Sequence, residues 1–348
     1  MIWIHLYDWW VIDYDQWVFN DIKLFMVIIF APSFLFISGI STFLWYKNKL
    51  LNVPNLDKHS LNMIRREYMF RTLIIFIIAI IYNSFTAIRL HDISWIWTWF
   101  MLLTISISLF LAWPLLKCSK FFRLVIAISV WIINQIILRF LSIYEGESNI
   151  YGILFHLLYN SLDFDPILIF FPYFLFGTVI GDIIFDVYLI DNFTERRLAF
   201  KNKILIPISI LGVILIFSNL YPLVPLNSID NPFPWIVFAL GINLLILTVL
   251  LAIEEFEIFK TEKRYTFFFY FSYYSLTIYL SHNILYFFFN NTMNPIVYSI
   301  IIIGIFGIFQ FLLREVYKKY GYKASLKIQI NRISVGLANI IRKKRISY

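Results

Sequence analysis

The sequence predicts an all-α, polytopic integral membrane protein with about ten transmembrane helices, the first of which is truncated. Two observations predict this class. Hydrophobic residues make up 61% of the 348 positions and charged residues only 14%, which is not the composition of a soluble globular domain. Long, continuous apolar runs also recur along the whole chain, and many of them reach the length of about 20 residues that a spanning helix needs.

The apolar runs predict where these spans lie. The complete spans are expected at residues 22–46, 70–90, 95–117, 121–143, 166–189, 203–221, 233–252, 267–289 and 295–314. The apolar run before them ends near Val11, so it reaches only about half of the hydrocarbon thickness. It also lacks the basic start and the small-residue cleavage site of a signal peptide. We therefore expect it to be the second half of a helix whose first half is missing.

Basic side chains define the two sides of this predicted bundle. If successive spans alternate in direction, nearly all of the 29 lysines and arginines fall on one side, at the connections near 47–69, 117–123, 190–203 and 253–266 and after residue 315. The positive-inside rule makes that side cytoplasmic, together with both chain termini, in a protein of the cell membrane. This placement explains the net charge of +8, so the lipid bilayer and not nucleic acid is the expected partner.

Two groups of polar residues in apolar surroundings are candidates for catalysis. His5 and Asp8 lie at i, i+3 in the first run, and an aspartate beside an imidazole fixes its tautomer and raises its basicity. Ser275, Tyr279 and His282 lie at i, i+4 and i+7 and form one polar stripe on a helix. A histidine inside a span is costly unless it faces protein or water, which marks His282 as a functional candidate. Ordinary hydrogen bonding between helices is the alternative for the stripe.

Three further charged residues lie toward the outer ends of their spans: Asp163, Asp165 and Arg139. They share the outer side with the histidines, so we expect them to contact the substrate. Arg139 has an alternative role, because its long side chain can extend to the outer surface of the membrane.

Charged residues at the cytoplasmic side suggest a second site. Arg65, Arg66 and Arg71 lead into a span from that side, and arginine makes bidentate contacts with the phosphates of a cosubstrate. Anchoring of the topology is the alternative for each arginine. Asp182 and Asp186, at i and i+4, either pair with the basic inner segments or act as a proton or cation relay. Neither zinc-ligand spacing nor a glycine-rich phosphate loop occurs, so no metal is expected.

The chain divides into a membrane domain at residues 1–315 and a basic tail at residues 316–348. Apolar residues of the tail recur at helical spacing, namely Leu326, Ile330, Ile333, Leu337, Ile340 and Ile341. With Lys327, Arg332 and the basic cluster 342–345, this spacing predicts an amphipathic helix on the inner leaflet, held there by anionic lipid. A basic tail without fixed structure is the alternative.

Three stretches of the chain resemble one known family. Residues 34–39 read Phe-Leu-Phe-Ile-Ser-Gly and are similar to a Phe-x-Phe-x-Ser-Gly signature. Residues 163–166 read Asp-Phe-Asp-Pro and, with Pro172, Gly177 and Gly181, are similar to Asp-Tyr-x-Pro…Pro-Trp…Gly-x-x-x-Gly. Residues 275–282 look like the motif Ser-Leu-x-Ile-Tyr-Leu-x-His. Over roughly residues 1–290 the chain therefore resembles the heparan-α-glucosaminide N-acetyltransferase-like transmembrane acyltransferases.

This resemblance implies transfer of an acyl group, usually acetyl, to a sugar on the far side of the membrane. The donor would be acetyl-CoA or another acyl-CoA from the cytoplasm, and the acceptor an outward-facing glycan or lipid-linked sugar. His5, oriented by Asp8, would take the proton of the acceptor. His282 would act as a second base or bind the acceptor beside Tyr279. A second copy of the chain, in a homodimer, is a further expected partner.

The chain departs from the family pattern at three places. The Asp-x-x-Arg-Gly element of the family's first helix would fall before Met1, so either the start lies upstream or part of the motif is lost. Residues 97–99 replace a Gly-x-Leu-His element, and Asp182 stands where relatives often carry a basic residue. Two other functions stay open. One is a transporter or flippase for a lipid-linked or small solute, acting through Asp182, Asp186 and Arg139, and the other is a non-catalytic membrane partner with the same fold.

Overall fold

The structure of the chain is a computed structural model that describes residues 2–53, 58–160, 165–219, 233–258, 266–289 and 291–346. Within these ranges every secondary-structure element is a helix, apart from an isolated β-bridge between Val11 and Met293. Seven helices of the described part are long and apolar enough to cross a membrane. The predicted all-α membrane class is therefore confirmed, and the chain is a multi-pass membrane protein.

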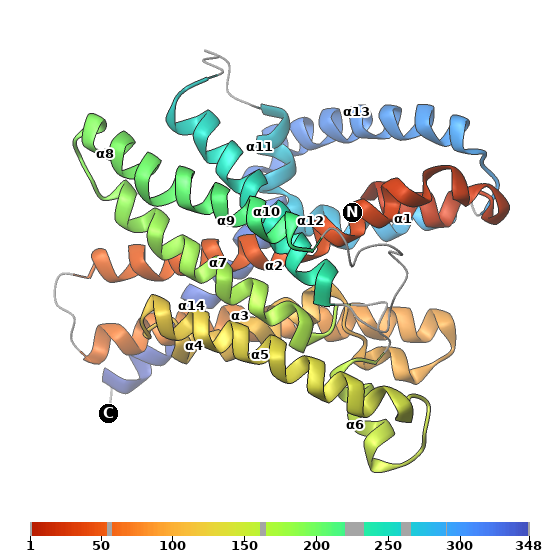
Figure 1. Cartoon of the computed structure of the whole chain (residues 1–348), viewed down its shortest axis with the longest axis horizontal. Helices are drawn as coiled ribbons and strands as arrows, with labels where there is room; N and C mark the ends of the chain where they lie inside the picture. The colour runs from red at the N-terminus through yellow and green to blue at the C-terminus, as the bar shows by residue number, and fades with distance from the viewer. Residues whose placement is uncertain are drawn as a thin grey trace. The chain divides into compact units, whose positions relative to one another are not determined.

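Figure 1 shows the helices in chain order. The first half of the chain contains α1 (Ile2–Trp10), η1 (Asp13–Phe19), α2 (Asn20–Leu51), α3 (Lys58–Leu90), η2 (Ile93–Trp97), α4 (Met101–Leu115), α5 (Lys120–Leu141), η3 (Ser142–Tyr144) and α6 (Ile150–Leu158). The second half contains α7 (Ile167–Tyr188), α8 (Phe193–Phe200), η4 (Lys201–Leu205), α9 (Ile206–Phe217), α10 (Phe233–Glu255), α11 (Thr266–Tyr273), α12 (Ser275–Ser281), η6 (His282–Phe287), α13 (Pro295–Tyr320), η7 (Gly321–Ala324) and α14 (Leu326–Ile346). The η segments are short 3₁₀ helices, except η4, which is a turn of π-helix.

The span expected at 95–117 is shorter in the structure. Its helix, α4, has 15 residues. At 1.5 Å per residue this is about 22 Å, less than the ~30 Å of the hydrocarbon core. The residues before α4 are held in η2 and in extended backbone, because the Asn83 side-chain amide donates to the carbonyl oxygens of Ile96 at 3.1 Å and Thr98 at 2.8 Å. These two tertiary hydrogen bonds, and not apolarity, therefore set where this helix begins.

The span expected at 267–289 is divided into α11, α12 and η6. The break lies at Tyr274, whose backbone leaves the α-helical region with φ −103° and ψ 14°. The Tyr273 carbonyl oxygen accepts the Ser325 hydroxyl at 2.7 Å, and the Tyr274 hydroxyl donates to the Gly321 carbonyl oxygen at 2.7 Å. These contacts with a distant segment stabilise the break. The predicted polar stripe therefore begins at the start of a new helix and not in the middle of a span.

The chain forms two compact units, one of residues Met1–Phe30 with Lys260–Tyr348 and one of residues Ala31–Phe259. The boundary falls within α2, beside Pro32. Proline lacks the backbone N–H that an inner helical position uses, which weakens the helix at this point. In the larger unit α5 packs with α7, α9 with α10, and α3 with α4. In the smaller unit α1 packs on η6 and α13, and α12 packs on α14.

Two glycines allow α2 and α7 of the larger unit to pack backbone against backbone. A Cβ atom on Gly39 would lie 2.0 Å from the Phe174 carbonyl oxygen, and one on Gly177 would lie 2.0 Å from the Phe36 carbonyl oxygen. A close-packed interior has no room for an atom at that distance, so only glycine fits at either position. Both glycines belong to the sequence stretches that resemble the acyltransferases, and the structure gives them a packing role.

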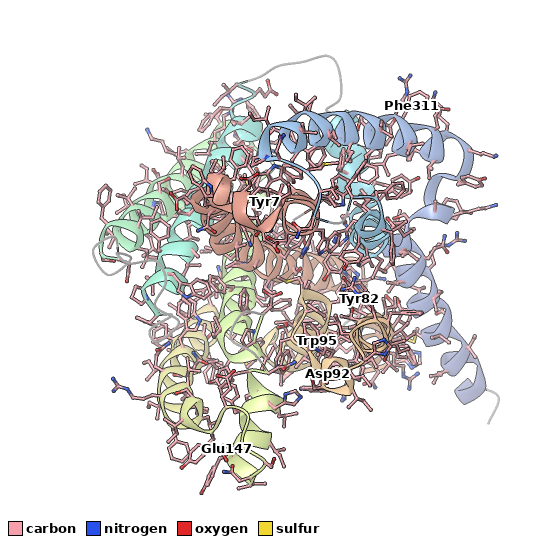
Figure 2. All side chains as sticks on the ribbon, turned by 90° about the vertical axis from the view of Figure 1, so that its right-hand side faces the viewer. Tyr7, Tyr82, Asp92, Trp95, Glu147 and Phe311 are labelled. Atoms are coloured by element: carbon pink, nitrogen blue, oxygen red, sulfur yellow. The ribbon has the colours of Figure 1, made fainter. Side chains whose placement is uncertain are left out.

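Tryptophans in the segment before α4 join helix ends of the larger unit. The indole N–H groups of Trp97 and Trp99 both donate to the Leu157 carbonyl oxygen, at 3.0 and 3.1 Å. Figure 2 shows Trp95 close to Asp92, in the connection that follows α3. This aromatic segment therefore links the start of α4 to the end of α6.

Candidate active site

The short N-terminal helix α1 is joined to a segment from the other end of the chain. The Ile12 N–H donates to the Met293 carbonyl oxygen at 3.0 Å, and the Met293 N–H donates to the Trp10 carbonyl oxygen at 2.8 Å. The Trp10 indole also donates to the Leu285 carbonyl oxygen at 2.9 Å. Buried apolar side chains of α1, α12 and α13 pack around this junction. Because α1 has only nine residues, these long-range contacts hold it in place.

His5 and His282, both predicted as catalytic, meet at this junction. Their ring centroids lie 5.2 Å apart. The Trp9 ring stacks against both, with its centroid 5.5 Å from that of His5 and 5.8 Å from that of His282. His282 is buried, with 2% of its surface exposed, and His5 is half-buried. The structure thus brings two imidazoles from opposite ends of the chain into one aromatic cluster.

The hydrogen bonding of His282 defines its tautomer. Nδ1 of this histidine contacts the backbone carbonyl oxygen of Tyr279. A carbonyl oxygen only accepts, so Nδ1 is the donor and carries the proton. In the neutral ring Nε2 then has a free lone pair, and among the described residues it has no hydrogen-bond partner although it is buried. A buried imidazole nitrogen of this kind can accept a proton from a bound substrate.

The other predicted residues of the smaller unit, Asp8, Ser275 and Tyr279, lie on α1 and α12. The Asp8 carboxylate forms an ion pair with Lys23 of α2, a partner that the sequence did not indicate. The Tyr279 ring lies 5.8 Å from the His282 ring, in addition to the contact of its carbonyl oxygen. Ser275 begins α12, and His282 follows the end of the same helix. The two predicted groups of polar residues therefore belong to one compact unit.

Asp165 lies in the larger unit, in the segment before α7. Its N–H donates to the Trp99 carbonyl oxygen at 2.9 Å, and its carbonyl oxygen accepts the Thr104 hydroxyl at 2.6 Å. Burial raises the pKa of the Asp165 carboxyl to about 7. Asp163, its predicted companion, lies outside the described residues. Asp165 thus combines a fixed backbone with a carboxyl group that changes protonation near neutral pH.

The arginines predicted to contact substrates lie on two helices of the larger unit. Arg139 is in the last turn of α5 and is exposed. Arg65 and Arg66 lie near the N-terminal end of α3, where the first is exposed and the second half-buried. Arg71 follows on the same helix and is also half-buried. The three arginines predicted for phosphate binding therefore lie along one end of α3.

Arg123 is a residue that sequence reasoning missed. Its guanidinium group is fully buried, pairs with the Asp182 carboxylate, and donates to the Thr178 carbonyl oxygen at 2.8 Å. Lys120 pairs with Asp186 and lies 3.9 Å from an Asp182 oxygen. The prediction that both aspartates pair with basic residues is therefore confirmed. The sequence does contain a signal for this ion pair, because Arg123 and Asp182 lie at a similar depth in two apolar spans and have opposite charges.

The comparisons with known proteins agree with the resemblance seen in the sequence motifs. Residues 1–218, more than half of the chain, match the family described as heparan-alpha-glucosaminide N-acetyltransferase, catalytic. The match includes His5 and Gly39 and ends before His282. No curated protein and no solved structure matches the chain. In the part of the chain that the structure describes, no three or more His, Cys, Asp or Glu side chains are grouped so that they could hold a metal ion. The chain belongs to the heparan-alpha-glucosaminide N-acetyltransferase catalytic family, a family of membrane acetyltransferases.

Proposed function

We propose that the chain transfers an acetyl group, or a similar acyl group, from cytoplasmic acyl-CoA to an outward-facing glycan or lipid-linked sugar. Membership of the family supports acetyl transfer at a membrane. The observation that carries the proposal is the 5.2 Å contact of the His5 and His282 rings, with Nε2 of His282 free of partners among the described residues. Such a transferase needs a base for the acceptor, and a neutral imidazole near pH 7 is such a base.

In the proposed reaction the acceptor oxygen or nitrogen attacks the carbonyl carbon of the thioester. A bond forms between the acceptor and this carbon, the bond from carbon to the CoA sulfur breaks, and the sulfur leaves as a thiolate. The proton of the acceptor passes to an imidazole and then to the thiolate, so the products are an ester or amide and free CoA. His5 takes this proton, while Nε2 of His282 binds the acceptor or acts as a second base.

The cosubstrate would bind at the basic side of the membrane. Arg65, Arg66 and Arg71 lie along one end of α3, and their guanidinium groups are suited to the phosphates of acyl-CoA. The positive-inside rule assigns this end, and both chain termini, to the cytoplasm. Ser275 and Tyr279 of α12 would bind the acceptor together with His282. Asp163, Asp165 and Arg139 stay proposed substrate contacts of the larger unit.

Two other functions compete with this proposal. A transporter or flippase would use Asp182 and Asp186 as a relay, but their pairing with Arg123 and Lys120 favours a structural role for both carboxylates. A non-catalytic partner would keep the fold without the reaction. Binding of acyl-CoA separates the acyltransferase from the transporter, and turnover separates it from the non-catalytic partner.

The test is acetyl transfer by the purified full chain in proteoliposomes, with radiolabelled acetyl-CoA on one side and a panel of soluble and lipid-linked sugars on the other. Release of free CoA is followed in the same vesicles. We expect the wild type to label an acceptor, and His5→Ala and His282→Ala to fall to background. His59→Ala, at an exposed position near the start of α3, is the matched control and should keep its activity. Full transfer by both histidine variants would overturn the proposed site.

A further inference from the structure

The chain leaves helix α13 through a tight turn and continues as α14. α13 has 26 residues, which is about 39 Å of helix and more than the ~30 Å of the hydrocarbon core. Its last turn contains Lys318 and Lys319, which favour the headgroup region. Gly321 then takes a positive φ of 51°, and α14 begins at Leu326. Figure 2 shows the blue chain turning here, so α14 does not continue along the axis of α13. It therefore starts near the membrane surface.

Hydrogen bonds fix the start of α14 to α11 and α12. The Thr277 hydroxyl donates to the Ala324 carbonyl oxygen and accepts the Leu326 N–H, both at 3.1 Å. The buried Ser325 hydroxyl donates to the Tyr273 carbonyl oxygen at 2.7 Å. Leu326 is the first residue of α14, and Ala324 and Ser325 directly precede it, so these bonds fix where the helix begins.

α14 has a buried face and a neighbouring apolar face that is exposed. Ile330, Ser334 and Ala338 lie at i, i+4 and i+8 and are 4%, 1% and 0% exposed. The exposed apolar residues are Ile333 (50%), Leu337 (38%), Ile340 (55%) and Ile341 (38%). They recur at helical spacing and form one stripe, called here the apolar stripe. A contiguous exposed stripe of this kind marks a surface that binds another apolar phase.

The charges of α14 indicate which kind of surface the apolar stripe binds. The helix contains Lys327, Arg332 and the basic cluster 342–345, and its sequence has no acidic residue. These charges prevent it from crossing the hydrocarbon core. A helix with an apolar stripe and only basic charges lies in the plane of the interface, where anionic headgroups attract it.

We infer that α14 lies on the surface of an anionic membrane leaflet. The apolar stripe enters the boundary between headgroups and acyl chains, and the basic residues contact the headgroups. The cluster 342–345 lies near the C-terminal end of α14, whereas Thr277 of α12 binds the N-terminal end. The helix is therefore held by protein at its start and by lipid at its end. This role does not depend on acetyl transfer.

The test places a fluorescent probe on two faces of α14 in the full chain. Cys118 is the only cysteine, so Cys118→Ser provides a background for Leu337→Cys or Asn339→Cys. Leu337 belongs to the apolar stripe, whereas Asn339 is exposed on a different face. Each protein is labelled with an environment-sensitive dye and placed in nanodiscs of phosphatidylcholine, with or without phosphatidylglycerol. With phosphatidylglycerol, we expect the probe at 337 to be blue-shifted and several-fold less accessible to an aqueous quencher than the probe at 339.

A charge variant tests the lipid preference. Replacing the four residues of the cluster 342–345 with glutamine should abolish the effect of phosphatidylglycerol on the probe at 337. Equal quenching at both positions in anionic nanodiscs would overturn the proposal, as would equal protection of the probe at 337 in purely neutral lipid. Protection that appears only in discs with two copies of the chain would also overturn it, because a second copy would then cover the stripe.

Discussion

The imidazole rings of His5 and His282 lie with their centroids 5.2 Å apart, and the Tyr279 carbonyl oxygen contacts Nδ1 of His282. Replacing His282 with asparagine keeps a side-chain N–H for this carbonyl but removes Nε2. We expect His282→Asn to unfold at the temperature of the wild type and to transfer acetyl about 10²- to 10⁴-fold more slowly, the usual contribution of a general base. Thermal unfolding and initial rates in detergent check both statements.

Acetyl-CoA binding by the same variant is the control, and we expect it to be unchanged. A His282→Asn protein that transfers acetyl at the wild-type rate would show that Nε2 takes no part in the reaction.

The close crossing of α2 and α7 predicts that alanine destabilises the protein at some glycines and not at others. Gly39→Ala or Gly177→Ala would place a methyl group 2.0 Å from a backbone carbonyl oxygen, and overpacking of this kind costs at least about 1–3 kcal/mol. Gly304 and Gly307 of α13 have open space at the same position. Their alanine variants should be neutral or more stable by up to about 1 kcal/mol. Thermal unfolding of the four variants measures the difference, and equal shifts in all four would contradict the close crossing.

Removing only one partner of the buried ion pair between Arg123 and Asp182 should lower the free energy of unfolding considerably. Asp182→Leu leaves the fully buried guanidinium without its carboxylate, which typically costs about 3–5 kcal/mol. Adding Arg123→Met removes the stranded charge, so the double variant should regain most of the lost stability. Glu315→Gln, which removes the exposed partner of Lys318, should cost less than about 1 kcal/mol.

Chemical or thermal unfolding in detergent gives these free energies. If the double variant were no more stable than Asp182→Leu alone, the interpretation of Arg123 as a stranded buried charge would be wrong.

Asp165 predicts a pH dependence of stability. Burial raises its pKa to about 7 in the folded chain, whereas an unfolded aspartate titrates near pH 3.9. Between about pH 4 and pH 7 the carboxyl is therefore protonated in the folded chain and ionised in the unfolded chain. The stability that Asp165 contributes through this difference is complete below about pH 4 and is lost as the pH rises through about 7. Asp165→Asn cannot ionise, so the unfolding temperature of the variant relative to wild type should increase over this range. Parallel pH profiles of the two proteins would show that the carboxyl is not buried.

Much of the fold could be predicted from local features. Apolar runs mark the helices because each segment transfers into the bilayer according to its own composition. The exceptions are α4 and the pair α11 and α12, whose ends depend on the side chains of Asn83 and Ser325. Both residues lie outside the segment that they interrupt, so no window of sequence around the helix contains the signal.

In the candidate site, too, local sequence indicated single residues, whereas their contacts depend on the tertiary structure. His5 and His282 could be singled out from the cost of an imidazole in an apolar run, and Gly39 and Gly177 from their motifs. The sequence did not indicate that the two histidines touch, or that Arg123 pairs with Asp182. The contact of the two histidines depends on backbone hydrogen bonds such as that from Ile12 to Met293, which join α1 to a distant segment of the chain. The ion pair depends on the packing of α5 with α7.

By itself, the sequence determined the membrane class, the approximate spans, the family and the residue types available for chemistry. These properties depend on the composition of single segments, whose preferences for lipid or water add up along the chain. Only the tertiary structure decided that Trp9 stacks against two imidazoles that also contact each other, and that α2 and α7 touch at their glycines. It also decided that Nε2 of His282 has no hydrogen-bond partner among the described residues. A contact between two side chains depends on which segments pack together, and that choice is made by interactions between residues far apart in the sequence.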